Sequence, residues 1–191
     1  MNIEKSNIAK LPTKHGNFKI KAYKDDYQEH LAIMSEDFEK IEVPYVRIHS
    51  ECLTGDALGS LKCDCQEQLN LALDFIAKNG GLVIYHKQEG RNIGLFNKVN
   101  AYSLQDLGRN TIEANLELGF KEDERDYSII GYILEDLGVK KLKLITNNPE
   151  KIEYVESLGI QIVERIPAII EANKYNEKYL ATKKEQMGHL L

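Results

Sequence analysis

Three cysteines, Cys52, Cys63 and Cys65, lie within fourteen residues and are the only cysteines in the chain. Structural zinc is almost always held by four protein ligands, whereas catalytic zinc keeps one position open for water or substrate. Three thiolates by themselves cannot complete a tetrahedral site. The number and spacing of these cysteines therefore predict a three-thiolate zinc site with one open position.

Other roles for the cysteines fit their surroundings less well. Free cysteines often pack as small buried hydrophobes, but Cys63 and Cys65 flank Asp64 in a polar segment. A disulfide is disfavoured because the number of cysteines is odd and nothing in the sequence indicates an oxidising compartment. A closed structural site completed by a distant histidine stays open as an alternative, and its candidate ligands are His49, His86 and His189.

Composition limits the class of protein. A chain of 191 residues, 42% hydrophobic and 29% charged, is expected to fold as one domain over residues 1–191 and is neither disordered nor membranous. The net charge of −5 disfavours binding to nucleic acid, which requires a basic surface. We find no signal-peptide-like or membrane-spanning apolar run, so we expect a cytoplasmic protein without a membrane partner.

Hydrophobic periodicity predicts the elements that position the cysteines. Strands and turns are expected over roughly the first 45 residues, with a hairpin turn at 15–17, and further strands at 43–48, 82–86, 141–146 and 160–165. Helices are expected at about 69–79, 95–107, 111–118, 127–137 and 149–158. We predict an α+β (α/β-like) fold with a mixed sheet flanked by helices. It ends in a C-terminal βαβ unit with a right-handed crossover and a weakly periodic tail over about 167–191.

Two helix faces and two helix caps follow from the same pattern. The first helix is expected to place Leu69, Leu73, Ile76 and Ala77 on one face, and the second to carry Leu95, Val99, Tyr102 and Asp106 on successive turns. Asp126 is the expected N-cap of the helix at 127–137. Asn148, followed by Pro149 at the first helical position, is the expected N-cap of the helix at 149–158.

Four polar segments fall where these elements end, at 47–51, 88–94, 120–126 and 146–151. Such positions commonly carry binding residues. Glycines at 90 and 94 allow a ligand to approach the backbone, and Arg91 and Lys151 near helix N-termini suit a phosphate. Each segment taken singly also fits a solvated strand face or simple helix capping. Together with an open zinc site, the four segments predict hydrolysis of a phosphorylated substrate.

The motifs closely resemble those of GTP cyclohydrolase II over nearly the whole chain. The resemblance is carried by residues 47–56, 62–65, 85–95, 110–115, 123–126, 144–149 and 184–191. In many organisms this enzyme is fused behind a dihydroxybutanone-phosphate synthase domain, and the length of this chain favours the stand-alone form.

The resemblance implies opening of the guanine imidazole ring of GTP, with C8 released as formate and the outer phosphates as pyrophosphate. The product is 2,5-diamino-6-(5-phosphoribosylamino)pyrimidin-4(3H)-one, the first intermediate of riboflavin biosynthesis. The resemblance further implies that Cys52, Cys63 and Cys65 bind one Zn²⁺ whose water attacks C8, that Mg²⁺ binds the GTP phosphates, and that the chain forms a homodimer. The GTP-contacting positions would be Arg47, Ile48, His49, Ser50, Glu51, Gln68, Glu89, Gly90, Arg91, Thr111, Thr146 and Lys151.

Three further residues match catalytic positions of the family. Asp123 and Arg125 match the proton acceptor and a nucleophile toward the α-phosphorus. Because a guanidinium with a pKa above 12 is a poor nucleophile, stabilisation of phosphoryl charge by Arg125 is an alternative, and the sequence leaves both open. Tyr102 matches a tyrosine of the later ring-opening steps, which favours the complete reaction over a paralogue that retains the formyl group.

Two other classes of protein fit the sequence less well. A structural zinc knuckle in a nucleic-acid-binding module is disfavoured by the acidic net charge and by the absence of a basic, aromatic-rich stripe. A metal-free redox protein is disfavoured because the chain has no C-x-x-C motif.

Overall fold

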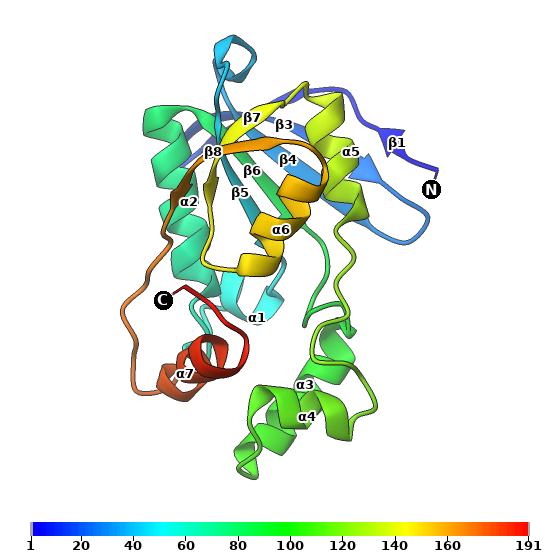
Figure 1. Ribbon diagram of the computed structural model, residues 1–191, viewed down its shortest axis with the longest axis vertical. Helices are drawn as coiled ribbons and strands as arrows, with labels where there is room; N and C mark the ends of the chain where they lie inside the picture. The colour runs from blue at the N-terminus through cyan, green and yellow to red at the C-terminus, as the bar shows by residue number, and fades with distance from the viewer. Residues whose placement is uncertain (1, 191) are drawn as a thin grey trace.

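The computed structural model describes residues 2–190, which form one mixed sheet with helices on both faces (Figure 1). Met1 and Leu191, which the prediction of one domain over 1–191 includes, lie outside the described residues. The eight strands are β1 (Glu4–Lys5), β2 (Ala9–Thr13), β3 (Gly16–Lys24), β4 (Glu29–Ser35), β5 (Tyr45–Ser50), β6 (Gly81–His86), β7 (Lys141–Ile145) and β8 (Gln161–Ile166).

The sheet combines antiparallel and parallel pairing. Its order is β1-β3-β4-β6-β5-β7-β8, with β2 paired to β3 at one edge. Pairing among β1 to β4 and between β4 and β6 is antiparallel, whereas β5 runs parallel to β6 and β7, and β7 runs parallel to β8. This mixture confirms the α+β class. The expected early hairpin is also present, with Thr13 of β2 opposite Gly16 of β3.

Seven α-helices and one short 3₁₀ helix are described between residues 2 and 190. They are η1 (Phe38–Lys40), α1 (Leu53–Asp56), α2 (Cys65–Asn79), α3 (Gly94–Asp106), α4 (Thr111–Glu117), α5 (Ser128–Asp136), α6 (Pro149–Ser157) and α7 (Glu177–Gln186). None of the helices in this part of the chain is long and apolar enough to cross a membrane.

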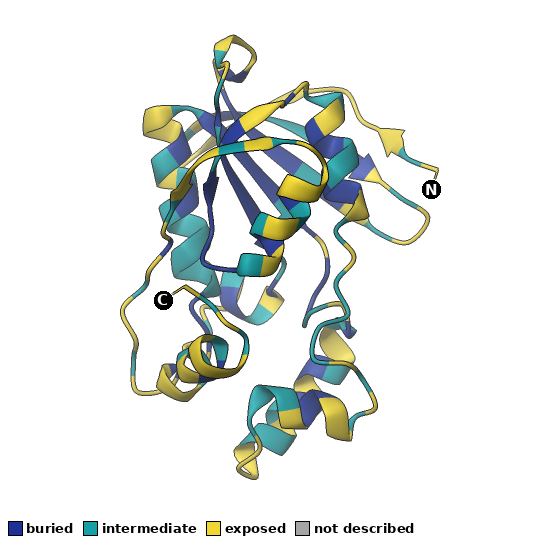
Figure 2. Cartoon of the chain, viewed as in Figure 1, coloured by how far each residue is buried: buried dark blue, intermediate teal, exposed yellow. Residues whose placement is uncertain are grey.

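Two apolar clusters, one on each face, hold the helices to the sheet, and the central strands are buried on both sides (Figure 2). On one face α2 buries Ala72 and Ile76, with Leu69 and Leu73 packed beside them. Ala77, expected on this face, is exposed instead, since Ala72 lies between Leu69 and Ile76 on the helix surface and takes the inward position. On the opposite face α5 and α6 cover the sheet.

Two helices differ from the predictions. The inward face of α3 carries Lys98 and Ala101, while Leu95 and Val99 are exposed, because α3 packs against a polar pocket and not against an apolar core. The helix α5 begins one residue after Tyr127, its N-cap; Asp126 accepts a hydrogen bond from the Ser128 amide at 2.8 Å instead of occupying the cap position.

The expected C-terminal tail contains a helix. The segment before α7 is fixed by asparagine side chains: Asn176 Oδ1 accepts from the Asn173 amide at 2.7 Å, and Asn173 Oδ1 accepts from the Tyr175 amide at 2.8 Å. Within α7 only Thr182 is fully buried. The helix therefore lacks the apolar stripe by which a surface helix is usually recognised in a sequence.

Candidate active site

A pocket lies at the carboxyl ends of the three parallel strands β5, β6 and β7. In open sheets with parallel strands, ligands bind beyond these ends because the loops that leave neighbouring strands converge there. The loops that follow the three strands carry Cys52, Arg91 and Thr146, all of which line the pocket. The helices α3, α4 and α7 lie at the same end of the molecule (Figure 1) and contribute the remaining walls.

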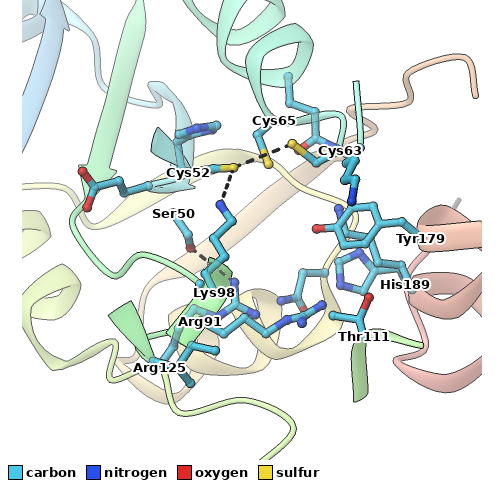
Figure 3. A pocket seen from close by; sticks show the side chains of 18 of the residues that line it. Ser50, Cys52, Cys63, Cys65, Arg91, Lys98, Thr111, Arg125, Tyr179 and His189 are labelled. Carbon is cyan, nitrogen blue, oxygen red and sulfur yellow. Dashed lines mark hydrogen bonds between the residues drawn. The ribbon is translucent and has the colours of Figure 1, made fainter. Parts of the chain in front are cut away.

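The three cysteines meet at one end of this pocket (Figure 3). Their sulfur atoms lie within 4.8 Å of one another, and Cys52 Sγ is 3.7 Å from Cys63 Sγ. A Cβ atom on Gly55 would lie 2.9 Å from Cys63 Sγ and 3.1 Å from Cys52 Sγ, so the absence of a side chain there leaves the sulfurs the room they need. Among residues 2–190, no histidine joins this group. The cysteines could thus hold a metal such as zinc through sulfur ligands alone.

The protonation of the cluster is uneven. Hydrogen bonds from the thiols of Cys63 and Cys65, together with the ammonium of Lys98 at 3.0 Å, lower the pKa of Cys52. The hydrogen bond to Cys52 raises the pKa of Cys63 to about 11 and also raises that of Cys65. Lys98 is held in place by Glu89 at 2.6 Å. A metal bound by all three sulfurs would displace the protons of Cys63 and Cys65.

Buried cationic groups form another part of the pocket. Burial and the nearby charges of Arg125 and Arg47 lower the pKa of Lys151 far below its usual value, and its ammonium donates to the Ile48 carbonyl at 2.9 Å. Burial and the charges of Lys183 and Lys151 lower the pKa of His189 to about 3. The His189 imidazole is therefore neutral at neutral pH, and the positive charge of the pocket rests on Arg47, Arg125 and Lys183, although the chain carries a net charge of −5. Such a site is stabilised by an anion.

Arg125 is clamped by Asp123. Its Nε lies 2.9 Å and 3.0 Å from the two carboxylate oxygens, its Nη2 also bonds Asp123, and its Nη1 donates to Ser50 Oγ at 3.2 Å. Burial opposes ionisation of Arg125, but Tyr127 and the Asp123 carboxylate outweigh it and raise the pKa of the guanidinium. Burial likewise opposes ionisation of Asp123, and the hydrogen bond from Arg125 outweighs it and lowers the carboxyl pKa. The pair is thus fully ionised at neutral pH.

Tyr102 on α3 lies close to the cysteines. Its hydroxyl is 3.3 Å from Thr54 Oγ1, and the ammonium of Lys62 lies 5.0 Å from its ring centroid. Burial raises the pKa of the phenol, so it is protonated and able to donate a proton at neutral pH.

Most residues predicted for the site line this one pocket. They are Arg47, His49, Ser50, Glu51, Cys52, Cys63, Cys65, Gln68, Gly90, Arg91, Tyr102, Thr111, Arg125, Thr146 and Lys151. Three do not line it. Each of the three instead contacts a residue that does line it. The carbonyl of the buried Ile48 accepts a hydrogen bond from Lys151, the carboxylate of Glu89 contacts Lys98, and the carboxylate of Asp123 contacts Arg125.

Sequence reasoning missed several residues of the pocket. Lys98, Tyr179 and Lys183 were not predicted, and His189 was considered only as a distant metal ligand. Lys98 lies within α3 and belongs to no motif, so in the sequence it looks like a surface lysine; only its contact with Cys52 in the folded protein distinguishes it. The ending 184–191, which carries part of the family resemblance, was the one available signal that the C-terminal segment matters.

Comparisons with known proteins agree with the motifs. A family model described as GTP cyclohydrolase II matches residues 4–167. Proteins named GTP cyclohydrolase-2 from Campylobacter hominis and Helicobacter pylori are 59% and 55% identical to this chain; the alignments cover 100% and 99% of it and 97% and 98% of the relatives. The riboflavin biosynthesis protein RibBA of Synechocystis sp. is 52% identical over 99% of this chain, which corresponds to 35% of that relative.

The fold and the pocket define an α+β protein with a cavity lined by basic side chains next to a potential metal site. The sequence comparisons narrow this class. The chain belongs to the GTP cyclohydrolase II family, as the motifs in the sequence indicate.

Proposed function

We propose that this enzyme hydrolyses GTP to 2,5-diamino-6-(5-phosphoribosylamino)pyrimidin-4(3H)-one, formate and pyrophosphate, the first step of riboflavin biosynthesis. The observation that carries the proposal is the presence of a three-cysteine group and buried cations in one pocket. GTP needs both, because its ring must be hydrolysed at one end while its triphosphate is bound at the other. The names of the GTP cyclohydrolase-2 and RibBA relatives support the same substrate and pathway.

The proposed pose places C8 of the guanine beside the cysteines and the phosphates against the cations. Cys52, Cys63 and Cys65 would hold Zn²⁺, which when bound supplies Lewis-acid activation of water for attack on C8. Tyr102, protonated and at the same end of the pocket, donates a proton as the ring opens. At the other end Arg125, Lys151 and Thr146 bind the phosphates.

Arg47 and Gln68 complete the binding site in this proposal. Arg47 lines the pocket; its Nη1 donates to the Ile145 carbonyl at 3.0 Å, its Nη2 bonds Gln68, and its buried Nε has no partner among residues 2–190. Further GTP contacts are assigned to Ile48, His49, Ser50, Glu51, Glu89, Gly90, Arg91 and Thr111.

Arg125 acts as a charge stabiliser in this proposal and not as a nucleophile. A guanidinium attacks phosphorus only after losing its proton, and the Asp123 carboxylate holds that proton in place. The guanidinium of Arg125 then stays positively charged and stabilises the negative charge on the α-phosphoryl group as pyrophosphate leaves. Mg²⁺ is expected on the phosphates, since it would neutralise the charge that the cations leave uncompensated.

We also infer a homodimer. Several large apolar side chains of α3 and α4 are exposed, with Phe96 at 79% and Leu116 at 58% of their full accessibility. An exposed apolar patch of this kind commonly marks an interface between proteins. Sedimentation of the purified protein at micromolar concentration measures the mass; a monomer at all concentrations would contradict the inference.

Product analysis tests the proposed reaction. Purified protein is incubated with GTP and Mg²⁺, with and without a zinc chelator, and formate, pyrophosphate and the pyrimidine chromophore are assayed. We expect all three products without chelator and loss of formate with it. Pyrophosphate and a formamide without formate would indicate the formyl-retaining reaction instead.

A further inference from the structure

The helix α7 reaches the pocket although it lies outside the residues that the family model matches, 4–167. Tyr179 and Lys183 of this helix and His189 beyond it line the pocket, and Figure 3 shows Tyr179 and His189 across from Lys98. The described segment that follows α7 is fastened there by the amide of Leu190, which donates to the Asn147 carbonyl at 2.8 Å. The segment after residue 167 is thus a wall of the site.

Lys183 starts a continuous chain of hydrogen bonds from this wall into the site. Its ammonium lies 2.9 Å from Asp64 Oδ1, and the side chains of Lys183 and Asp64 are 12% and 2% exposed. The other oxygen, Asp64 Oδ2, accepts from Gln68 Nε2 at 2.6 Å, and Gln68 Oε1 accepts from Arg47 Nη2. Every link joins buried or half-buried side chains, where hydrogen bonds are strongest and a missing partner costs most.

The chain of contacts fixes which atoms Gln68 and Arg47 present. With Lys183 on one carboxylate oxygen, the other oxygen of Asp64 is left to accept from the Gln68 amide nitrogen, which turns the Gln68 carbonyl oxygen toward Arg47. Arg47, which lines the pocket, is thereby held in one orientation, with its buried Nε left without a partner among residues 2–190. Without the ammonium, Asp64 would be a buried carboxylate lacking its counter-charge, and both Asp64 and Gln68 would be free to turn.

We propose that Lys183 of α7 is a positioning residue for substrate binding, acting through Asp64 and Gln68 on Arg47. The inference rests on the proposed function, since it takes GTP as the ligand that Gln68 and Arg47 bind. It also gives the C-terminal segment a role: the binding site is complete only when α7 is docked on the rest of the molecule.

The adjacent residue on α7 provides a matched control. Lys184 is exposed, with no ion pair or side-chain hydrogen bond described for it, whereas Lys183 is half-buried and forms an ion pair with Asp64. Lys183→Met and Lys184→Met remove the same charge from neighbouring positions of one helix in the full-length protein. Lys183→Arg keeps the charge and a donor to Asp64.

The experiment measures kcat and KM for GTP, zinc per chain, the unfolding midpoint, and the affinity for GTP by calorimetry without Mg²⁺. For Lys183→Met we expect a loss of about 10- to 100-fold in kcat/KM, by analogy with the effect of removing residues that orient metal ligands. The loss should fall mainly on KM and recur as weaker GTP binding. Lys184→Met should match the wild type, and Lys183→Arg should recover part of the affinity.

Different outcomes of this experiment would contradict the role of Lys183 and the proposed reaction. If Lys183→Met binds and turns over GTP as Lys184→Met does, or lowers only the unfolding midpoint, Lys183 is a structural residue and the inference is wrong. A wild-type protein that binds GTP but releases no formate would contradict the proposed reaction, while the relative affinities of the two variants would still decide the role of Lys183. If Lys183→Met does not fold, Lys183→Gln, which keeps a hydrogen-bond donor but removes the charge, takes its place, and a GTP affinity equal to that of Lys184→Met would contradict an orienting role.

Discussion

Each of the three cysteines is held by a different segment: Cys52 caps α1, Cys65 starts α2 and Cys63 lies in the loop between them. Cys63→Ser therefore removes one sulfur without breaking a helix. Because two thiolates hold zinc poorly, we expect the variant to lose its zinc and its release of formate, as measured by elemental analysis and a formate assay. Ser60→Ala in the same loop is the control. A Cys63→Ser protein that keeps one zinc per chain and full activity would rule out the three-sulfur site.

Tyr102 offers a test of proton transfer during ring opening. Tyr102→Phe removes the hydroxyl that lies 3.3 Å from Thr54 Oγ1 but keeps the ring. Because general acid catalysis is worth about 10²- to 10⁴-fold, we expect formate release to slow by a factor in this range while pyrophosphate release continues. Time courses of both products, with mass spectrometry for a formamide intermediate, measure the effect. The exposed Tyr175, changed to Phe, is the control. Formate release at the wild-type rate would make Tyr102 a packing residue only.

Arg125 distinguishes two mechanisms for loss of pyrophosphate. As a charge stabiliser clamped by Asp123, it should form no covalent adduct, and Arg125→Lys should keep part of the activity because the charge remains while the fork is lost. Arg125→Gln, which removes the charge, should lose about 10³-fold or more. Intact-mass spectrometry of wild-type enzyme quenched during turnover is the direct measurement. A guanylyl mass increment on the peptide that contains Arg125 would establish the nucleophile instead.

Among the elements, α6 shows how an N-cap that can be recognised in the sequence stabilises a helix next to the pocket. Asn148 Oδ1 accepts from the Glu150 amide at 2.9 Å and Pro149 occupies the first helical position, both as the sequence predicts. Asn148→Ala should lower the free energy of unfolding by about 1 kcal/mol, the usual cost of a lost N-cap, whereas Asn148→Asp should retain most of it. Urea denaturation measures both variants. Equal stability of Asn148→Ala and the wild type would mean that packing of Val155 alone holds the helix.

Elements with a local signal could be predicted, and those held by distant polar contacts could not. The apolar spacing of Ile130, Ile133 and Leu134 predicts α5, and these residues are fully buried. The inward face of α3 and the whole of α7 lack such a signal. Their positions depend on contacts of Lys98 and Lys183 with residues 46 and 119 positions away, which no local pattern reports.

The residues of the site likewise divide into those that a local motif predicts and those that only distant contacts bring into the pocket. Motif residues on the loops after β5, β6 and β7 were predicted together from their place at element ends and from the family resemblance. They meet in the structure because the carboxyl ends of parallel strands lie at one edge of a sheet. The sequence could not place the C-terminal segment against that edge. The sequence did predict that arginines and a lysine gather to bind an anion, but it could not reveal that Lys183 joins them.

At the scale of the whole molecule, His86 at the end of the central strand β6 makes the stability of the fold depend on pH. This residue is fully buried; its ring stacks on that of His30 with centroids 5.1 Å apart, and the tilted ring of Tyr127 lies 5.6 Å away. Burial, followed by the charges of His30, Lys151 and Arg125, lowers its pKa to about 3. His86 is therefore neutral in the folded protein at every pH at which the enzyme is expected to work.

The sign of the pH dependence follows from this shift. Between pH 6.5 and about 3 the unfolded chain binds a proton at His86 that the folded chain does not, so the stability present above pH 6.5 falls as the pH is lowered, by about 1.4 kcal/mol per pH unit. His86→Phe keeps the stacked ring but removes the titrating group. We expect the variant to lose about 2 kcal/mol less than the wild type between pH 7 and pH 5, as measured by urea denaturation at each pH. Parallel losses in the two proteins would show that His86 is not a source of the acid sensitivity.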